Sequence, residues 1–141
     1  VGAVEAVRRA VLDDLLAAGV VPVVSPISLG PDARSWNVNA DTAAAAIAAA
    51  IGAAQLVLVS NVPGVRIGDA VADRLDAAAV AAAIDGGAIA GGMVPKVQAA
   101  LAAVAGGVAE ARIADLAAWA AGGGTAIVAT PPAVGGAERA T

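Results

Sequence analysis

The sequence of 141 residues contains no cysteine and no histidine. Without cysteine it can form no disulfide, no thiolate metal site and no cysteine nucleophile. Without histidine it lacks the commonest transition-metal ligand and the usual general base at neutral pH. Chemistry is left to carboxylates, amides, hydroxyls, arginines, backbone groups and a single lysine, Lys96. We therefore predict no metal site built by protein side chains.

Phenylalanine and tyrosine are also absent, and the apolar residues are mostly Ala and Val, so small aliphatic side chains must build the core. The net charge is -4, and neither end carries a basic run, which argues against nucleic acid or an anionic membrane as a partner. The apolar stretch 42–60 is divided by Gly52 and Gln55 and has no aromatic or basic flanks, so it does not predict a membrane span. No secretory signal pattern is present, and we expect a cytoplasmic protein that acts on small molecules.

Helical spacing of apolar residues predicts a helix over 5–18 that ends at Gly19. Asn39 or Asp41 can cap an alanine-rich helix that runs to about Ile51 and stops at Gly52. Further helices are expected in three places: 76–84, 94–104 and 116–121. The predicted helices are separated by segments that are not helical, and two of these segments have the pattern of strands.

Two short apolar runs, VVPVVS at 20–25 and QLVLVS at 55–60, have the pattern of strands buried on both faces. Weaker strands are expected at 109–114 and 125–129, and a loop or hairpin at 27–36. Buried strands that alternate with helices predict an α/β fold, a three-layer α/β/α sandwich with a mainly parallel central sheet. We assign it to one domain over 1–130, with a disordered tail at 131–141.

In such sheets ligands bind where loops leave the carboxyl ends of the strands. The first polar segment expected there holds Asn37, Asn39 and Asp41, which alternate as residues on one side of an extended chain do. They could converge on one ligand. The alternative is helix capping, which needs no ligand and explains most such residues.

The second segment, SNVPGV at 60–65, follows a predicted strand. Gly64 permits positive φ and close approach of the backbone to a ligand, but a plain type II turn would explain Pro63-Gly64 equally well. The third segment places Gly91 and Gly92 before a helix whose first turn holds Pro95 and Lys96. A glycine loop before a helix offers free amides to an anion, and a lysine there opposes the helix dipole. A surface lysine that bends away is the alternative, and neither GxxxxGK[ST] nor GxGxxG occurs.

Taken in order, five segments of the sequence resemble the C-terminal half of the amino acid kinase family: VVPVVSPI, NVNAD, LVLVSNVPGV, GGAIAGGMVPKVQAAL and GTAIV. The GGMVPK segment is most similar to members that phosphorylate N-acetyl-L-glutamate. The resemblance implies transfer of the γ-phosphoryl of ATP to the γ-carboxylate of N-acetyl-L-glutamate, a step of arginine biosynthesis. It also implies a homo-oligomer at full length and Mg²⁺ held mainly through the phosphates of ATP.

The resemblance further implies a role for particular residues. Asn37 and Asn39 would bind the acylamino acid, Asp41 would orient the catalytic lysines, and Lys96 would stabilise charge on the transferring phosphoryl. The expected nucleotide-binding residues are Ser60, Asn61, Val62, Pro63, Gly64, Val65, Arg66, Ala88, Ile89, Ala90, Gly92 and Met93.

The sequence departs from the family in one large respect, since the Lys-Gly-Gly loop of the N-terminal half does not occur in it. We therefore expect a fragment that supplies the nucleotide site and is catalytic only with the missing half. Two alternatives stay open at this point. One is a kinase of the same fold for aminoadipate or glutamate carried on an acidic protein, and the other is a folded domain without catalytic activity.

Overall fold

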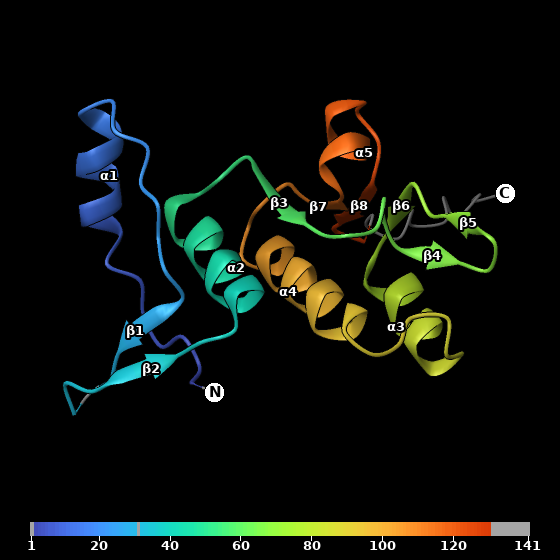
Figure 1. Cartoon of the computed structure of the whole chain (residues 1–141), viewed down its shortest axis with the longest axis horizontal. Coiled ribbons are helices and arrows are strands. Elements are labelled where there is room, and N and C mark those ends of the chain that lie inside the picture. Colours follow the sequence, from blue (N-terminus) through green and yellow to red (C-terminus); the bar gives the residue numbers. More distant parts are fainter. Residues whose placement is uncertain (1, 31, 131–141) are drawn as a thin grey trace, which may run out of the picture.

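The computed structural model describes residues 2–30 and 32–130, and a four-stranded sheet lies at its centre (Figure 1). The strands are β3 (Gln55–Val59), β7 (Glu110–Ala114), β8 (Thr125–Val128) and β6 (Arg74–Leu75), in the spatial order β3-β7-β8-β6. The pairs β3·β7 and β6·β8 are parallel, and β7·β8 is antiparallel. The prediction of a mainly parallel central sheet is confirmed.

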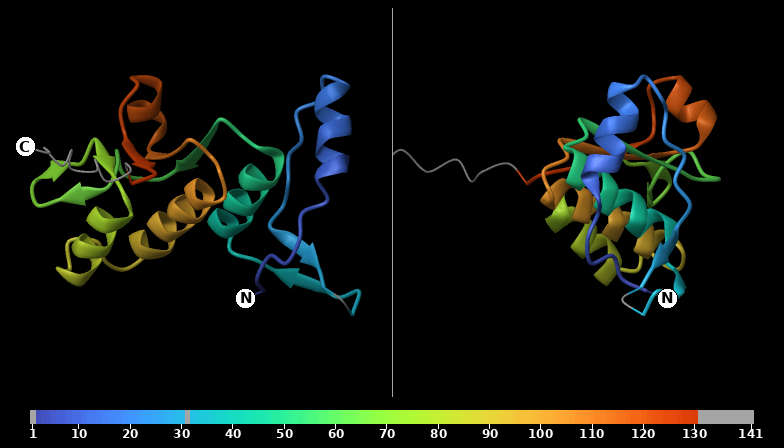
Figure 2. Two further views of the ribbon diagram at one scale, coloured as in Figure 1. Left: turned by 180° about the vertical axis from the view of Figure 1, so that it is seen from behind. Right: turned by 90° about the vertical axis from the view of Figure 1, so that its left-hand side faces the viewer.

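Helices cover the two faces of this sheet unequally. On one face lie α2 (Ala40–Ile51), α3 (Ala77–Asp85) and α4 (Met93–Ala105), and on the other lies α5 (Leu116–Ala120) (Figures 1 and 2). The first helix, α1 (Arg9–Ala17), packs chiefly against α2. The α/β/α arrangement is therefore confirmed. In the described residues, the second helical layer consists of the short helix α5.

The core is made of small aliphatic side chains, as the composition required. On α4, Val97, Ala100 and Ala103 recur every third residue and are fully buried against the sheet, where Ile113 and Ile127 are also fully buried. Burial of each Val or Ile stabilises the fold by about 1.5–3 kcal/mol. Alanines on both helices let α2 and α4 pack closely along their length.

Local capping fixes where the helices begin and end. The side chains of Asn39, Asp76 and Asp115 each accept a hydrogen bond from the backbone amide three residues further on, at 3.0, 2.9 and 2.6 Å. Each such cap is worth about 1 kcal/mol. Gly52 ends α2, as predicted, and does so in the left-handed conformation, and Gly19 adopts positive φ just after α1. The remaining predicted helices are confirmed to within one residue, whereas α1 begins only at Arg9 rather than at residue 5.

The predicted strand at 20–25 is wrong. These residues form no strand, and the side chains of Val21 and Val23 are 82% and 97% exposed. An apolar run becomes a buried strand only where a neighbouring strand accepts its hydrogen bonds, and in the described residues none pairs with it. The expected hairpin does form next to it, from β1 (Ile27–Leu29) and β2 (Ser35–Asn37).

Three very short strands had no signal in the sequence. An antiparallel hairpin joins β4 (Arg66–Ile67) to β5 (Ala70–Val71), and β6 also has only two residues. Two residues are too few to show the alternation that marks a strand. The predicted tail at 131–141 lies outside the described residues. In the part of the chain that the structure describes, no helix combines the length and the apolar character needed to cross a membrane.

Candidate functional site

Two helix N-termini lie side by side at one edge of the sheet. Each of α2 and α4 leads by a short connection into the strand that follows it, β3 and β7, so each helix runs antiparallel to that strand (Figure 1). The beginnings of the two helices therefore lie at the edge where β3 and β7 end. This is the edge at which α/β sheets bind ligands.

An ion pair joins the first turns of these two helices. The ammonium of Lys96, on α4, donates to both carboxylate oxygens of Asp41, on α2, over 2.9 and 3.1 Å. The two side chains are 16% and 25% exposed, so the pair is largely sheltered from solvent. In the sequence the partners are 55 residues apart. The structure thus brings together the two residues for which a catalytic role was predicted.

The electrostatics of the two partners differ. A carboxylate in the first turn of a helix is favoured by the helix dipole, and an ammonium in the same position is disfavoured. Asp41 therefore stabilises the start of α2 and at the same time offsets the charge that Lys96 places at the start of α4. An anion that approached this edge would meet the ammonium of Lys96, the carboxylate of Asp41 beside it and the positive ends of two helices.

The alternation that placed Asn37, Asn39 and Asp41 on one side of an extended chain does not hold. Only Asn37 lies in a strand, at the end of β2, whereas Asn39 caps α2 and Asp41 lies inside it. The extended backbone ends at the cap residue Asn39. The direction of the Asp41 side chain is therefore set by the helix, and it reaches Lys96 on α4. The capping interpretation is confirmed for Asn39, whose side-chain oxygen accepts from the Thr42 amide.

The loop of residues 60–66, which we call the SNVPG loop, is held at two points on the same edge of the sheet. The amide of Ser60 donates to the carbonyl of Ala114, at the end of β7, over 2.8 Å. The amide of Val65 donates to the hydroxyl of Thr125, at the start of β8, over 2.8 Å. Between these points Asn61 and Pro63 are exposed. The expected nucleotide loop is therefore a short span fixed at both ends.

The expected positive φ at Gly64 is wrong. Gly64 is not among the residues of positive φ, so the turn is not of type II. A glycine is required there for another reason: a Cβ would lie 2.6 Å from Cγ1 of Val71 and 2.7 Å from Oγ1 of Thr125. The close approach is to β8 and the hairpin, and glycine permits it by lacking a side chain.

The glycine loop before α4 also differs in detail from its prediction. The amides of Met93 and Val94 donate to the carbonyls of Ala90 and Gly91 over 3.3 and 3.2 Å, and Pro95 has no amide hydrogen. Fewer free amides than expected therefore remain in the first turn of α4. Gly91 does adopt positive φ, of 56°.

The remaining expected nucleotide residues differ in exposure, and Val62 and Met93 are half-buried. Ala88, Ala90 and Gly92 are exposed, whereas the side chains of Val65 and Ile89 are 1% and 2% exposed and belong to the core. For the two buried residues, only the backbone is available to a ligand. Arg66 is exposed, and its guanidinium donates to the carbonyl of Asp69 within the β4·β5 hairpin.

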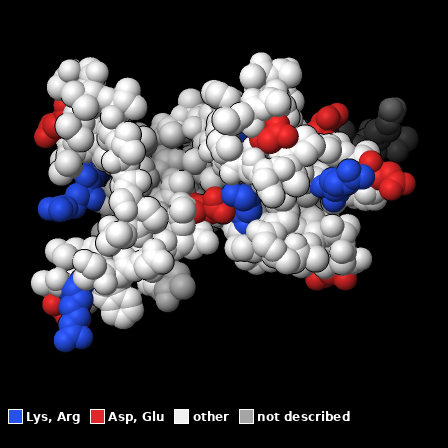
Figure 3. Space-filling view, viewed as in Figure 1, with Lys and Arg blue, Asp and Glu red and all other residues white. Residues whose placement is uncertain are grey.

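The described residues hold no group of three or more carboxylates, histidines or cysteines that could bind a metal ion. Charged side chains are few and scattered on the face shown in Figure 3. A cation that accompanies a ligand would therefore find its oxygen ligands mainly on that ligand and on water.

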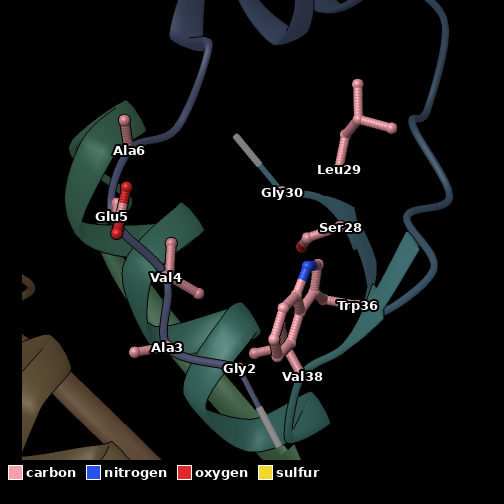
Figure 4. A pocket seen from close by; sticks show the side chains of 10 residues that line it. All are labelled: Gly2, Ala3, Val4, Glu5, Ala6, Ser28, Leu29, Gly30, Trp36 and Val38. Carbon is pink, nitrogen blue, oxygen red and sulfur yellow. The ribbon is translucent and has the colours of Figure 1, made fainter. Parts of the chain in front are cut away.

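Two hollows lie elsewhere on the molecule. One of about 520 Å³ separates residues 2–6 from the β1·β2 hairpin, with Trp36 on its wall (Figure 4). The other, of about 350 Å³, lies between residues 22–26 and α2. Neither is lined by Lys96, Asp41 or the SNVPG loop, so the candidate site coincides with neither hollow.

Sequence reasoning missed a polar cluster on β7. Oε1 of Glu110 accepts from Nε of Arg112 at 2.9 Å and from Nε2 of Gln55 at 2.7 Å, and Arg112 also donates to the carbonyls of Gly122 and Gly123. The Arg112 hydrogen bond holds the pKa of Glu110 below its ordinary value, although burial acts to raise it. The alternating charges of EAR at 110–112 were the available signal.

Comparison with known proteins agrees with the fold and the motifs. Residues 1–115 match the model of the amino acid kinase family. A protein named acetylglutamate kinase from Geobacillus stearothermophilus is 48% identical over 113 residues, 80% of this chain and 44% of the relative. One of the same name from Roseiflexus sp. (strain RS-1) is 52% identical over 116 residues, 82% of this chain and 44% of the relative.

A solved structure shares the fold at lower sequence identity. The crystal structure of smu.665 from Streptococcus mutans UA159 superposes with a TM-score of 0.79 at 31% sequence identity, over 86% of this chain and 48% of that chain. This chain therefore spans less than half of the length of each of these relatives.

Proposed function

The chain belongs to the amino acid kinase family, and on that basis we propose that residues 1–130 form the nucleotide-binding part of an acetylglutamate kinase. The reaction would move the γ-phosphoryl of ATP to a γ-carboxylate oxygen of N-acetyl-L-glutamate. The bond from the γ-phosphorus to the bridging oxygen of ADP breaks, and an acyl phosphate forms. The observation that carries the proposal is the Lys96–Asp41 pair at two helix N-termini, on the sheet edge that also holds the SNVPG loop.

Lys96 would neutralise the charge that develops on the transferring phosphoryl. In phosphoryl transfer the protein contributes mainly position and charge, so an ammonium held in place before the nucleotide arrives fits this chemistry. Asp41 would hold Lys96 in that position through its two hydrogen bonds of 2.9 and 3.1 Å. No histidine or cysteine is needed for such a step.

Asn37 and Asn39 would bind the acceptor. The side-chain oxygen of Asn39 is already used by the cap of α2, which leaves its two amide hydrogens as donors. Donors of this kind suit the carboxylates of N-acetyl-L-glutamate. Asn37 lies at the exposed end of β2, two residues before this cap.

The SNVPG loop would line the nucleotide together with residues 88–90, Gly92 and Met93, largely through backbone groups and small side chains. Mg²⁺ would be carried by the phosphates of ATP and by water, which fits the lack of a carboxylate cluster in the described residues. A cytoplasmic location and, at the length of the relatives, a homo-oligomer are further parts of the proposal that rest on family resemblance.

Isothermal titration with MgADP and MgATP tests the proposal on the chain as it stands. We expect binding in the millimolar range or tighter, and a loss of about 10- to 100-fold in Lys96→Ala, because a charged hydrogen bond to phosphate is removed. Arg9→Ala is the matched control, since it removes one positive charge on α1, away from the candidate site. No binding at millimolar nucleotide would refute the proposal.

The acceptor is tested by a coupled assay for ADP on a form of the protein that spans the length of the relatives. It is offered N-acetyl-L-glutamate and, separately, aminoadipate or glutamate on an acidic carrier protein. Turnover with N-acetyl-L-glutamate alone is the expected result. Turnover only with a carrier-linked acceptor would support a kinase but refute N-acetyl-L-glutamate as its substrate.

A further inference from the structure

We infer that Thr125 is a positioning residue for the SNVPG loop, an inference that rests on the proposed function of this loop in nucleotide binding. Thr125 begins β8 and is fully buried. In the described part of the chain it is the one buried residue that is polar. Buried hydroxyl groups need hydrogen-bond partners, and the partners of the Thr125 hydroxyl show which segments it holds together.

The Thr125 hydroxyl bridges the two chain segments at the base of the β4·β5 hairpin. It accepts from the amide of Val65 at 2.8 Å and donates to the carbonyl of Ala72 at 2.6 Å. Val65 and Ala72 flank the hairpin, and the amide of Ala72 donates to the carbonyl of Val65 at 2.9 Å. One side chain on β8 thus fastens the two residues at which the chain enters and leaves the hairpin.

Packing makes the same connection. Gly64 is buried so close to Thr125 that a Cβ on it would lie 2.7 Å from Oγ1 and 3.2 Å from the Thr125 backbone nitrogen. The loop therefore rests directly on β8. Its other end is tied to β7 through the amide of Ser60. With both ends fixed on neighbouring strands, the exposed residues between them have little freedom to move.

A loop that is ordered before its ligand arrives binds more tightly, because less freedom is lost on binding. Without the Thr125 hydroxyl, the amide of Val65 would lose its partner at a buried position, and the carbonyl of Ala72 would lose its partner at a partly buried one. The loop would then leave β8 to reach water. Thr125 acts on the nucleotide through this loop and does not need to touch it.

Thr125→Val tests the inference, because it keeps the shape of the side chain and removes the hydroxyl. Isothermal titration should show MgADP binding weakened about tenfold or more. Thr125→Ser keeps the hydroxyl and should bind within about threefold of the unchanged chain. Val108→Ala is the control for stability, since it truncates a core side chain that is 2% exposed just before the opposite end of β7. It should also bind within about threefold.

Amide hydrogen exchange of Val65 gives a second measurement that needs no nucleotide. In the unchanged chain this amide should exchange much more slowly than that of Asn61, and equal rates would overturn the inference even if Thr125→Val did not fold. Equal weakening in Thr125→Ser and Thr125→Val would overturn it as well, because the hydroxyl would not be the cause.

The inference and the proposed function fail in different ways. If the unchanged chain bound no nucleotide, the proposed function would fall and the inference with it. If the unchanged chain bound MgADP and Thr125→Val bound it equally well, only the inference would be overturned.

Discussion

Breaking the Lys96–Asp41 pair from one side or the other should cost unequal amounts of stability. Asp41 lies in the first turn of α2, where a carboxylate is favourable, and Lys96 lies in the first turn of α4, where an ammonium is unfavourable. Each of these helix interactions is worth about 0.3–1 kcal/mol. Both single substitutions lose the ion pair, so its energy cancels when the two variants are compared.

The difference can be worked out from the two helix ends. Asp41→Asn loses the favourable carboxylate at the start of α2 and keeps the unfavourable ammonium at the start of α4. Lys96→Met keeps the favourable carboxylate and removes the unfavourable ammonium. Asp41→Asn should therefore be the less stable variant by about 0.6–2 kcal/mol. The pair itself adds about 1–3 kcal/mol to the loss in each, because one charged partner is left partly buried.

Urea unfolding at low ionic strength measures both free energies, and Lys96→Gln repeats the comparison without the apolar thioether of Met. Asp13→Asn serves as a surface control: it breaks the Arg9–Asp13 pair, whose side chains are 57% and 46% exposed. That exposed i,i+4 pair is worth only about 0.3–0.5 kcal/mol. The reasoning would be refuted if Lys96→Met and Lys96→Gln were as destabilising as Asp41→Asn, or more so.

Two further substitutions test the polar cluster and the loop. Because Arg112 holds the pKa of Glu110 below its ordinary value of 4.5, ionised Glu110 stabilises the fold above that pH, and this contribution is lost as the pH falls through the lowered pKa. Glu110→Gln should therefore cost about 1–2 kcal/mol at pH 7 and progressively less as the pH falls below 4.5 in urea unfolding, and a cost independent of pH would contradict this. Gly64→Ala should cost about 1–3 kcal/mol, because its Cβ would lie 2.7 Å from Oγ1 of Thr125. Gly92→Ala, with right-handed backbone and open space around it, should stay within about 0.5 kcal/mol of the unchanged chain, and equal thermal shifts in the two variants would be evidence against the steric argument.

The features that local chemistry determines could be predicted from the sequence. The helix α2 is the clearest case, because Asn39 caps its start, alanine fills it and Gly52 ends it in the left-handed conformation. All three signals lie within fourteen residues and need no partner elsewhere. The strand β3 was predictable for the same reason, as a short apolar run between Gly52 and the SNVPG loop. Its predicted burial on both faces is wrong, because β3 lies at the edge of the four-stranded sheet and both Gln55 and Val59 are exposed.

Features that depend on distant partners could not be predicted in this way. The run at 20–25 has the composition of a buried strand, but burial requires a neighbour that the pattern cannot reveal. At Gly64 the local turn rule gave the wrong backbone conformation, because the need for glycine comes from contacts with Val71 in the hairpin and with Thr125, 61 positions later. A residue type can thus be required for a reason that its own neighbourhood does not contain.

The candidate site lies between these cases. Lys96 was suspect locally, because a lysine in the first turn of a helix opposes the dipole, and Asp41 had a sufficient local explanation as a first-turn carboxylate. The ion pair across 55 residues accounts for both at once. Nothing in the local pattern of either segment indicated that they would meet.

The pair has a consequence for how an anionic ligand would enter. Asp41 offsets the charge of Lys96 at the start of α4, which allows the fold to keep an ammonium at a position that would otherwise disfavour it. Under the proposed function, an arriving phosphate must compete with Asp41 for that ammonium. The phosphate would also meet the positive ends of α2 and α4, although Asn39 already caps α2 and the first-turn amides of Met93 and Val94 already have partners. Under this proposal the carboxylate holds the lysine in place until the ligand arrives, and the two anions then share one ammonium.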